Sequence, residues 1–422
     1  MSEPTPIDPA HDNQSGGENN KALHYPNFRN YLFARFFTTL AVQMQSVAIG
    51  WQVYSVTGDP LDLGLIGLAQ FLPFVILVLP AGQVADRFDR RLILTLCYIV
   101  ETVCALLLLG FTLSGTADIW PVFAILVLFG SARAFAMPTS QAITPNLVPR
   151  AAFPNAIALN SSFSHVATIA GPAVGGVMYV AGADVVYLTV SVILTASVLL
   201  MFRVKLPKAV RAPEPASWRS VLEGLHFVRS KPIILGAISL DLFAVLFGGA
   251  TALLPAYASD ILHTGPEGLG LLRTAPAIGA AIVAAVLVFY PITRHVGRWL
   301  FAGVVVFGVA IIIFGLSESF LLSMAALTLL GIGDMVSVYI RHLLVQLETP
   351  DNIRGRVSAV SSVFIGASNE LGEFESGLAA AWLGLVPAVV IGGGATLVVT
   401  AVWYRLFPQL AHMDKLPEAR QY

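Results

Sequence analysis

The sequence predicts an all-α membrane protein whose twelve transmembrane helices form two pseudo-symmetric six-helix bundles. Three observations support this fold class: the apolar composition, the number of long apolar runs, and the similarity between the two halves of the chain. Of the 422 residues, 56% are hydrophobic and only 12% are charged, whereas soluble domains carry about 25% charged residues. With a mean hydropathy of +0.77, most of the protein surface is expected to face lipid.

Twelve apolar runs are long enough to span a bilayer, which takes about 20 residues. They cover residues 31–55, 64–85, 92–113, 120–146, 155–180, 184–203, 232–258, 268–291, 299–315, 321–346, 357–380 and 387–407. A polar stretch between the sixth and seventh runs divides the chain into two halves. We therefore expect a disordered cytoplasmic tail at 1–27, an N-terminal bundle at 28–203, a cytoplasmic linker at 204–231, a C-terminal bundle at 232–407 and a cytoplasmic tail at 408–422.

Lys and Arg lie in every second connection between the apolar runs. The basic connections carry Arg87, Arg90 and Arg91; Arg150; Lys205 to Lys231; Arg294 and Arg298; and Arg354 and Arg356. The other connections, near 57–63, 114–119, 181–184, 259–267, 316–320 and 381–386, contain neither residue type. Because short cytoplasmic loops carry the excess of Lys and Arg, we expect both termini in the cytoplasm and a multi-pass protein of the cell inner membrane.

The two halves of the chain resemble each other. A shift of 201 residues without gaps places Gly171 on Gly372 and Gly176 on Gly377. A parallel repeat of two six-helix units has its pseudo-two-fold axis along the membrane normal, and transporters of this kind bind substrate near the midplane, between the halves. A duplicated scaffold that transports nothing is the structural alternative.

One basic connection concentrates charge between two apolar runs. From Gly82 to Arg91 it reads Gly-Gln-Val-Ala-Asp-Arg-Phe-Asp-Arg-Arg. Gly82 would let a helix end close to a neighbour, and Asp86 can accept from helix N–H groups or pair with Arg87 or Arg90. Arg90 and Arg91 can hold the loop at the negative cytoplasmic face. A basic loop that any multi-span protein could carry explains the composition equally well.

This stretch resembles the loop signature of the major facilitator superfamily, Gly-x-Leu-Ala-Asp-Arg-x-Gly-Arg-Arg. Val84 stands in place of the usual Leu and Asp89 in place of the usual Gly. The resemblance implies the two-bundle fold, secondary transport by alternating access, and a gating role for the loop. Because Asp89 adds a charge, the turn geometry of the loop could differ from that of the family.

A second motif points to one branch of the superfamily. Gly171, Pro172, Gly175 and Gly176 resemble the Gly-Pro-x-x-Gly-Gly helix-packing motif of the proton-coupled exporters, and small residues of this kind let helix backbones pack closely. Arg133, in the fourth run, resembles the membrane-embedded arginine of that branch. The chain is thus similar to the bacterial drug and siderophore exporters of the enterobactin type.

Ionisable residues inside transmembrane spans are costly and often mark pathways or proton relays. Arg35, Arg133, Asp241 and Asp334 lie in runs 1, 4, 7 and 10, and the family resemblance implies that these runs line the central cavity, where all four could meet. We therefore assign all four to the candidate substrate cavity. Arg133, Asp241 and Asp334 are also candidates for proton coupling, with the aspartates binding a proton when water leaves and releasing it when an arginine approaches. Static buried salt bridges are the alternative.

Run 11 contains three glutamates. Glu370 and Glu373 share a helical face, whereas Glu375 points elsewhere. Glu370 and Glu373 form either a second protonation site or cross-helix bonds to loop arginines that lock a gate. Gln43 and Gln45, in run 1, are candidates for hydrogen-bonding a ligand in the cavity, although such amides equally serve as contacts between helices.

Two further ionisable residues allow a structural interpretation. Glu101, in run 3, is solitary, which favours a contact between helices. Arg273, in run 8, lies near the predicted outer face, where snorkelling to the interface explains it as well as substrate contact does.

Together these patterns predict a secondary active transporter, not an enzyme, that exports amphipathic small molecules such as a drug, siderophore or metabolite in exchange for protons. Uptake or lipid flipping would use the same cavity, and a membrane sensor or scaffold is the alternative from another class. The sequence contains no phosphate-binding loop or paired-Cys metal motif. We therefore expect no cofactor beyond the proton gradient, no nucleic-acid partner at a net charge of −1, and a monomer in the bilayer.

Overall fold

The computed structural model describes residues 21–205 and 218–416. Three segments therefore lie outside the described residues. They are residues 1–20 of the predicted N-terminal tail, residues 206–217 of the predicted linker and residues 417–422 of the predicted C-terminal tail. The expected domain boundaries that fall on these segments stay predictions.

The described part of the N-terminal half consists of helices. In chain order these are η1 (Ala22–His24), α1 (Pro26–Thr57), α2 (Pro60–Arg87), α3 (Arg90–Ser114), α4 (Trp120–Ile143), η2 (Thr144–Asn146), η3 (Arg150–Ala152), α5 (Phe153–Tyr179) and α6 (Ala183–Arg203). We expected Gly82 to end a helix, but α2 continues through it to Arg87. The α2–α3 connection is therefore shorter than the motif, because Asp89 already caps α3 by accepting a hydrogen bond from the Arg91 N–H at 2.9 Å.

The C-terminal half is also helical throughout its described residues. Its elements are α7 (Trp218–Ser230), α8 (Pro232–Phe247), η4 (Gly249–Leu253), α9 (Leu254–Ala256), η5 (Tyr257–Ile261), α10 (Pro266–Phe289), α11 (Val296–Leu316), α12 (Phe320–Glu348), α13 (Asp351–Leu383), α14 (Leu385–Leu406) and α15 (Pro408–Ala411). Helix α7 lies inside the stretch predicted as a linker. Val228 on α7 is buried against Ile234 of α8 and Val357 of α13, which anchors α7 to the C-terminal bundle.

Ten helical stretches of the described chain are long and apolar enough to cross a membrane. The other two of the twelve expected spans are α5 and α13, with 27 and 33 residues. Both are long enough but more polar, because α5 carries Asn160, Ser161 and Ser162 and α13 carries Glu370 and Glu373. These two helices correspond to each other in the internal repeat, and each packs against a helix of the opposite bundle rather than against lipid alone.

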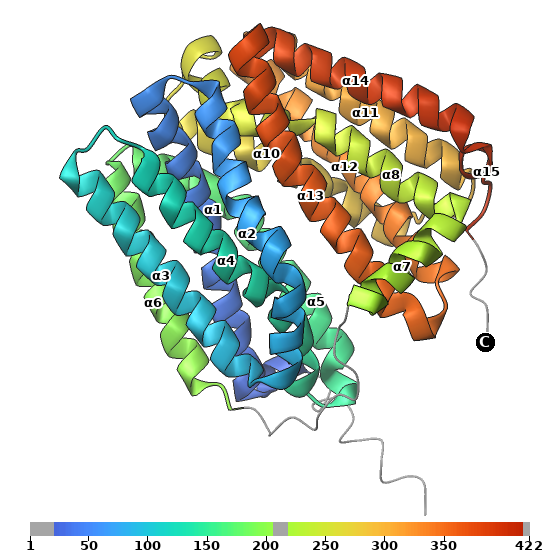
Figure 1. Cartoon of the computed structure of the whole chain (residues 1–422), viewed down its shortest axis with the longest axis horizontal. Coiled ribbons are helices and arrows are strands. Elements are labelled where there is room, and N and C mark those ends of the chain that lie inside the picture. The colour runs from blue at the N-terminus through green and yellow to red at the C-terminus, as the bar shows by residue number, and fades with distance from the viewer. Residues whose placement is uncertain (1–20, 206–217, 417–422) are drawn as a thin grey trace, which may run out of the picture.

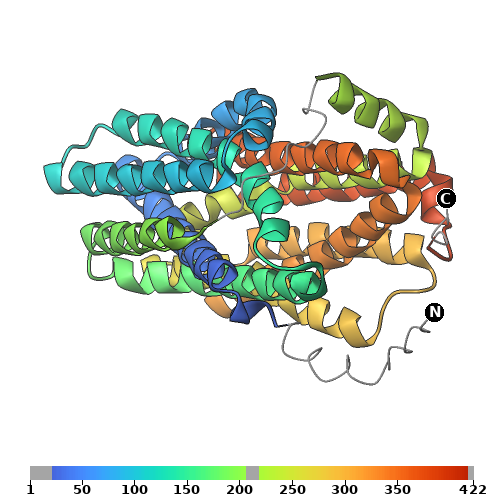
Figure 2. The same ribbon diagram turned by 90° about the horizontal axis from the view of Figure 1, so that it is seen from below.

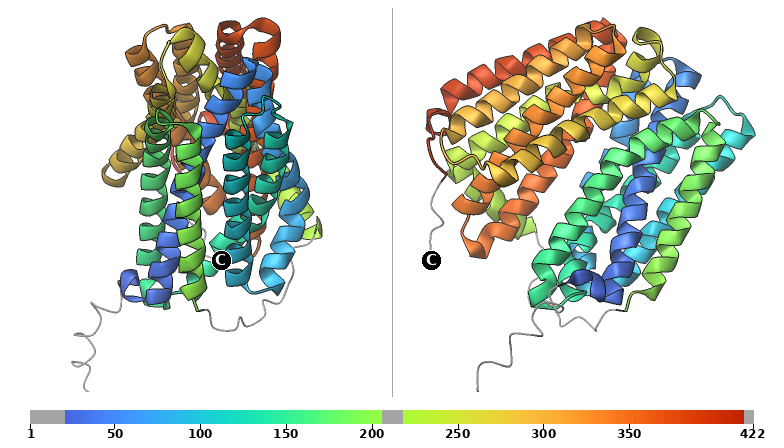
Figure 3. Two further views of the ribbon diagram at one scale, coloured as in Figure 1. Left: turned by 90° about the vertical axis from the view of Figure 1, so that its left-hand side faces the viewer. Right: turned by 180° about the vertical axis from the view of Figure 1, so that it is seen from behind.

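Helices α1–α6 form one bundle and α8–α14 form the other (Figure 1). Figure 2 shows the same two groups from below, with α3 and α6 on the side away from the C-terminal bundle. The bundles meet at the end where α1 turns into α2 and α13 into α14, and they diverge toward the end that carries α7 and the α2–α3 connection (Figures 1 and 3). We call these the closed end and the open end.

Glycines allow close contact within the N-terminal bundle. A Cβ atom on Gly175 of α5 would lie 2.7 Å from Met44 Cα of α1, and one on Gly130 of α4 would lie 2.3 Å from the Gln70 carbonyl oxygen of α2. Neither position can accept a side chain unless the backbones move apart.

We therefore predict that Gly175→Leu destabilises the protein, because overpacking a close helix contact costs about 1–3 kcal/mol or more. The measurement is thermal unfolding of the purified protein in detergent. Gly110→Leu on α3 is the matched control, since a Cβ atom there meets nothing within 4 Å. Equal unfolding temperatures for the two variants would contradict the packing argument.

Candidate functional site

Two adjoining cavities lie between the bundles. The closed-end cavity has a volume of about 300 Å³ and the open-end cavity about 510 Å³. Both are lined by Gln70, Arg133 and Glu370. The two cavities therefore adjoin at these three side chains, which lie between them.

Arg133 and Glu370 bring opposite charges from the two bundles together. Arg133 Nη1 of α4 lies 3.8 Å from Glu370 Oε1 of α13 and donates a hydrogen bond to Gln70 Oε1 of α2 at 3.3 Å. The Arg133 side chain is 47% exposed, so much of its planar group of five donors faces the cavity.

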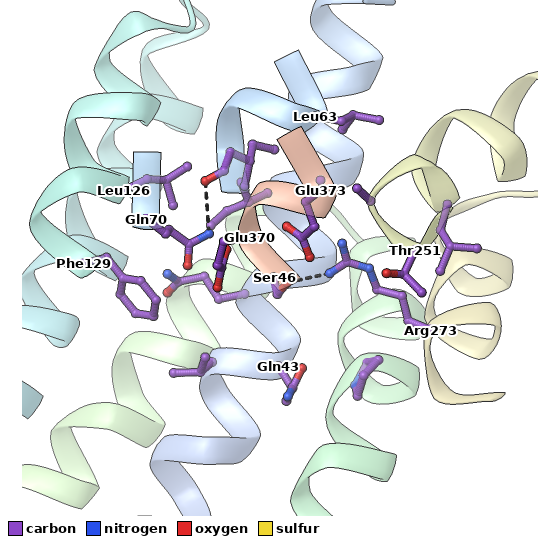
Figure 4. Close-up of a pocket in the computed structure, with 18 of the residues that line it drawn as sticks. Gln43, Ser46, Leu63, Gln70, Leu126, Phe129, Thr251, Arg273, Glu370 and Glu373 are labelled. Carbon is purple, nitrogen blue, oxygen red and sulfur yellow. Dashed lines mark hydrogen bonds between the residues drawn. The ribbon is translucent and has the colours of Figure 1, made fainter. Parts of the chain in front are cut away.

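A second polar cluster lies in the closed-end cavity. Arg273 of α10 donates a hydrogen bond to Ser46 Oγ of α1 at 2.5 Å, which joins the two bundles. The carboxyl group of Glu373 and the Arg273 guanidinium point toward each other (Figure 4). Glu373 also packs closely on Gly67 of α2, where a Cβ atom would lie 2.9 Å from Glu373 Oε2. Arg273 is thus a contact between bundles, which the sequence alone could not distinguish from snorkelling.

The structure brings most of the predicted cavity residues together. Gln43, Gln45, Arg133, Glu370 and Glu373 line the closed-end cavity, with Gln45 almost fully buried. Arg35 lines the open-end cavity with Arg133 and Glu370, and its Nη1 donates to the Tyr31 hydroxyl at 3.2 Å. Their roles in substrate binding and proton coupling stay predictions.

Asp241 and Asp334 lie elsewhere, which corrects the expectation that both face Arg35 and Arg133. Asp241 of α8 forms an ion pair with Arg341 of α12, and both side chains are almost fully buried. Asp334 lines a small separate void beside Asp241. The reason is that Arg341 follows Asp334 by two helical turns on α12 and supplies the C-terminal bundle with its own cation.

Sequence reasoning missed Arg341, although a signal was present. Arg341 lies inside the tenth apolar run, 321–346, on the same helical face as Asp334. A cation in that place could have indicated a partner for Asp241 within the bundle. Whether Asp241 and Asp334 bind transported protons stays a prediction.

The predicted gating loop binds the ends of its neighbours. Arg90 Nη1 donates to the Ala142 carbonyl oxygen of α4 at 3.0 Å, and Arg91 Nη2 donates to the Phe202 carbonyl oxygen of α6 at 2.7 Å. Both arginines satisfy carbonyl groups in the last turn of a helix, so they tie α3 to α4 and α6. Arg87 is exposed and Gly82 lies within α2, whereas the side chain of Asp86 lies outside the described part.

The glycine motif of α5 lies where three helices meet. A Cβ atom on Gly171 would lie 2.5 Å from Gln43 Cβ of α1, and one on Gly176 would lie 2.4 Å from the Pro266 carbonyl oxygen of α10. The Pro172 carbonyl oxygen in turn leaves no room for a Cβ atom on Gly270 of α10. With Gly175 against α1, the motif packs α5 on its own bundle through Gly171 and Gly175, and on the opposite bundle through Pro172 and Gly176.

We predict that Asp241→Asn lowers the stability of the protein strongly, because removing one partner of a buried ion pair leaves an uncompensated charge and costs about 3–5 kcal/mol. The double variant Asp241→Leu with Arg341→Met should recover much of this loss, since no charge then remains buried. Unfolding of both variants in denaturant is the measurement. An Asp241→Asn protein as stable as the wild type would exclude this pairing.

A family model described as transmembrane secretion effector, within the major facilitator superfamily, matches residues 21–421. The enterobactin exporter of Citrobacter koseri is 26% identical over 402 residues, which cover 93% of this chain and 94% of the relative. An uncharacterised transporter of the superfamily from Bacillus subtilis is 24% identical over 404 residues, which cover 88% of this chain and 92% of the relative.

A solved structure shares the fold. A bacterial homologue of the human lysosomal transporter Spinster, in an inward-facing and unoccupied conformation, has a TM-score of 0.72 at 15% identity, covering 91% of this chain and 97% of that one. The predicted fold class and the predicted superfamily are therefore confirmed. The chain belongs to the transmembrane secretion effector family of the major facilitator superfamily.

Proposed function

We propose that this protein exports amphipathic small molecules from the cytoplasm in exchange for protons. The observation that carries the proposal is the contact between Arg133 of the N-terminal bundle and Glu370 of the C-terminal bundle, which lie 3.8 Å apart at the centre of the two cavities. A charge pair that joins the two moving parts of an alternating-access transporter is well placed to link protonation to movement.

The lining of the cavities suits an amphipathic substrate. Phe71, Phe74 and Tyr98 line the open-end cavity beside the polar Arg35 and Asn369. Aromatic rings bury the apolar body of a ligand, while a few polar groups orient it. A drug, siderophore or metabolite with both kinds of surface fits this lining, and the enterobactin exporters among the relatives agree with such a substrate.

The contacts between the bundles at the closed end suit alternating access. Gly64 of α2 and Gly377 of α13 pack backbone to backbone, since a Cβ atom on Gly377 would lie 2.7 Å from Gly64 Cα. The Tyr54 hydroxyl donates to Asp260 Oδ2 across the bundles at 2.5 Å. In the alternate conformation the bundles would separate at the closed end, and these contacts would break. The open end would close in turn.

The distribution of basic residues supports the orientation. The open end carries Arg90 and Arg91, and the positive-inside rule places this end in the cytoplasm. Both termini would then be cytoplasmic, in the inner membrane of a bacterium. The open-end cavity would accept a substrate directly from the cytoplasm, as an exporter requires.

The pairing of Arg133 with Glu370 supports proton coupling. A carboxylate in a protein interior must be paired, whereas a protonated carboxyl group needs no cation. When Glu370 binds a proton, its attraction for Arg133 falls to that of a hydrogen bond, and the electrostatic link between the bundles weakens. A proton therefore changes the relative free energies of the two conformations, which is the requirement for coupling.

We predict that Glu370→Gln abolishes pH-gradient-driven accumulation of a dye in inverted membrane vesicles, because a residue that cannot ionise cannot link the gradient to bundle movement. A panel of amphipathic fluorescent dyes serves as the probe, and accumulation inside inverted vesicles corresponds to export. Exchange of dye across the membrane without a gradient should persist in the variant.

Glu375→Gln is the matched control on the same helix, because Glu375 lines neither cavity. Undiminished accumulation by Glu370→Gln would remove Glu370 from the coupling mechanism. Gradient-driven loss of dye from inverted vesicles loaded with it would point instead to uptake.

A further inference from the structure

Glu101 of α3 is a buried carboxyl group that the proposed export mechanism does not use. Its residue is 3% exposed, and its Oε2 atom has no hydrogen-bond partner among the described residues. The solitary position in the sequence favoured a contact between helices. The structure places Glu101 in the wall of the open-end cavity, and the expected contact between helices stays a prediction.

Charged and titratable groups from three other helices face the same cavity or act on Glu101. The groups are Arg35 on α1, Tyr98 together with Cys97 and Cys104 on α3 itself, Arg133 on α4, and Glu370 on α13. Arg35 already bonds the Tyr31 hydroxyl. Arg133 is a cation that acts electrostatically on Glu101, Glu370 and Glu373. Glu373, one helical turn from Glu370 on α13, also interacts with Glu370 and has Arg273 as its stronger cationic neighbour.

Glu101 and Glu370 are the two carboxyl groups that compete for the Arg133 guanidinium. The reason is that Arg273 is the stronger cationic neighbour of Glu373. Arg133 lies 3.8 Å from Glu370, a separation too long for a direct hydrogen bond. Its side chain is half exposed to the cavity, so it has room to turn. One arginine compensates one carboxylate, and a buried carboxyl group such as Glu101 avoids the cost of ionisation without a cation by keeping its proton. Titrations of such groups belong to the pair and not to either residue alone.

We propose that Glu101 and Glu370 share one proton, with Arg133 pairing with whichever of the two is ionised. In the exchange, the O–H bond of the Glu101 carboxyl group breaks and its proton passes to cavity water. A proton from water forms an O–H bond on Glu370, and the N–H donors of Arg133 turn from Glu370 to Glu101. No electrons are transferred, and the total charge of the three groups stays the same.

The exchange has a mechanical consequence because the two glutamates belong to different bundles. When Arg133 pairs with Glu370, the charge pair joins α4 to α13 across the cavity. When Arg133 pairs with Glu101, the pair lies between α3 and α4 of one bundle, and the link between the bundles is lost. Glu101 is thus the position that holds Arg133 when the bundles separate, and this part of the inference rests on the proposed function.

The test is infrared spectroscopy of the purified full-length protein in proteoliposomes at neutral pH. The C=O band of protonated carboxyl groups, identified by its shift in deuterated water, is the measurement. Glu101→Gln should lose intensity in this band. Glu370→Gln should lose the Glu101 contribution as well, because Arg133 then pairs with Glu101 alone. Arg133→Gln should gain intensity, since both glutamates then hold a proton.

Glu318→Gln is the matched control, because Glu318 is exposed in the connection between α11 and α12 and should leave the band unchanged. An unchanged band in Glu101→Gln, or in Glu370→Gln, would overturn the shared proton. If Glu101→Gln fails to fold, the Glu370→Gln and Arg133→Gln spectra decide the question, since both variants keep Glu101. The spectra require no transport, so a protein that shows these changes but moves no dye contradicts only the proposed function.

Discussion

The arrangement of this protein depends on backbone contact between the two bundles at one end. Gly64 on α2 meets Gly377 on α13, and Gly176 on α5 meets Gly270 on α10, at distances that leave no room for a Cβ atom. Such close approach gains van der Waals energy between the helices, which matters in a bilayer because lipid provides no hydrophobic driving force for helix association. Because the helices are stiff and their backbones pack most closely toward the closed end, they diverge toward the other end, and the cavities occupy the resulting space.

The two ion pairs inside the described part of the protein differ in whether they join the bundles. Asp241 and Arg341 pair inside the C-terminal bundle, so their bond can persist while the bundles move. Arg133 and Glu370 pair across the cavity, and their contact must change in any movement of one bundle against the other. Chemically similar pairs thus differ in role, because only one of them spans the moving boundary.

Much of the fold could be predicted from the sequence, and the failures have physical causes. The spans were recognisable because a helix that crosses the lipid bilayer needs a long run of apolar residues. The spans α5 and α13 carry a weaker apolar signal because their sequences include polar residues such as Asn160 and Glu370. Helix α7 was missed because its stretch is polar on average, and its buried residue Val228 packs in a cluster formed with α8, α12 and α13. Gly82 was misread because a glycine is tolerated inside a helix at a cost of about 1 kcal/mol, and α2 continues through it to Arg87.

The sequence by itself determined the all-α membrane fold, the internal repeat and the set of candidate residues. These follow from composition, from the apolar runs and from the positions of charges along the chain, which do not depend on how distant segments pack. Only the tertiary structure decided which charges meet. Arg133 faces Glu370 rather than Asp334, and Asp241 faces Arg341. The reason is that pairing depends on helix rotation and on which helices are neighbours, and both are set by side-chain packing between segments far apart in the sequence.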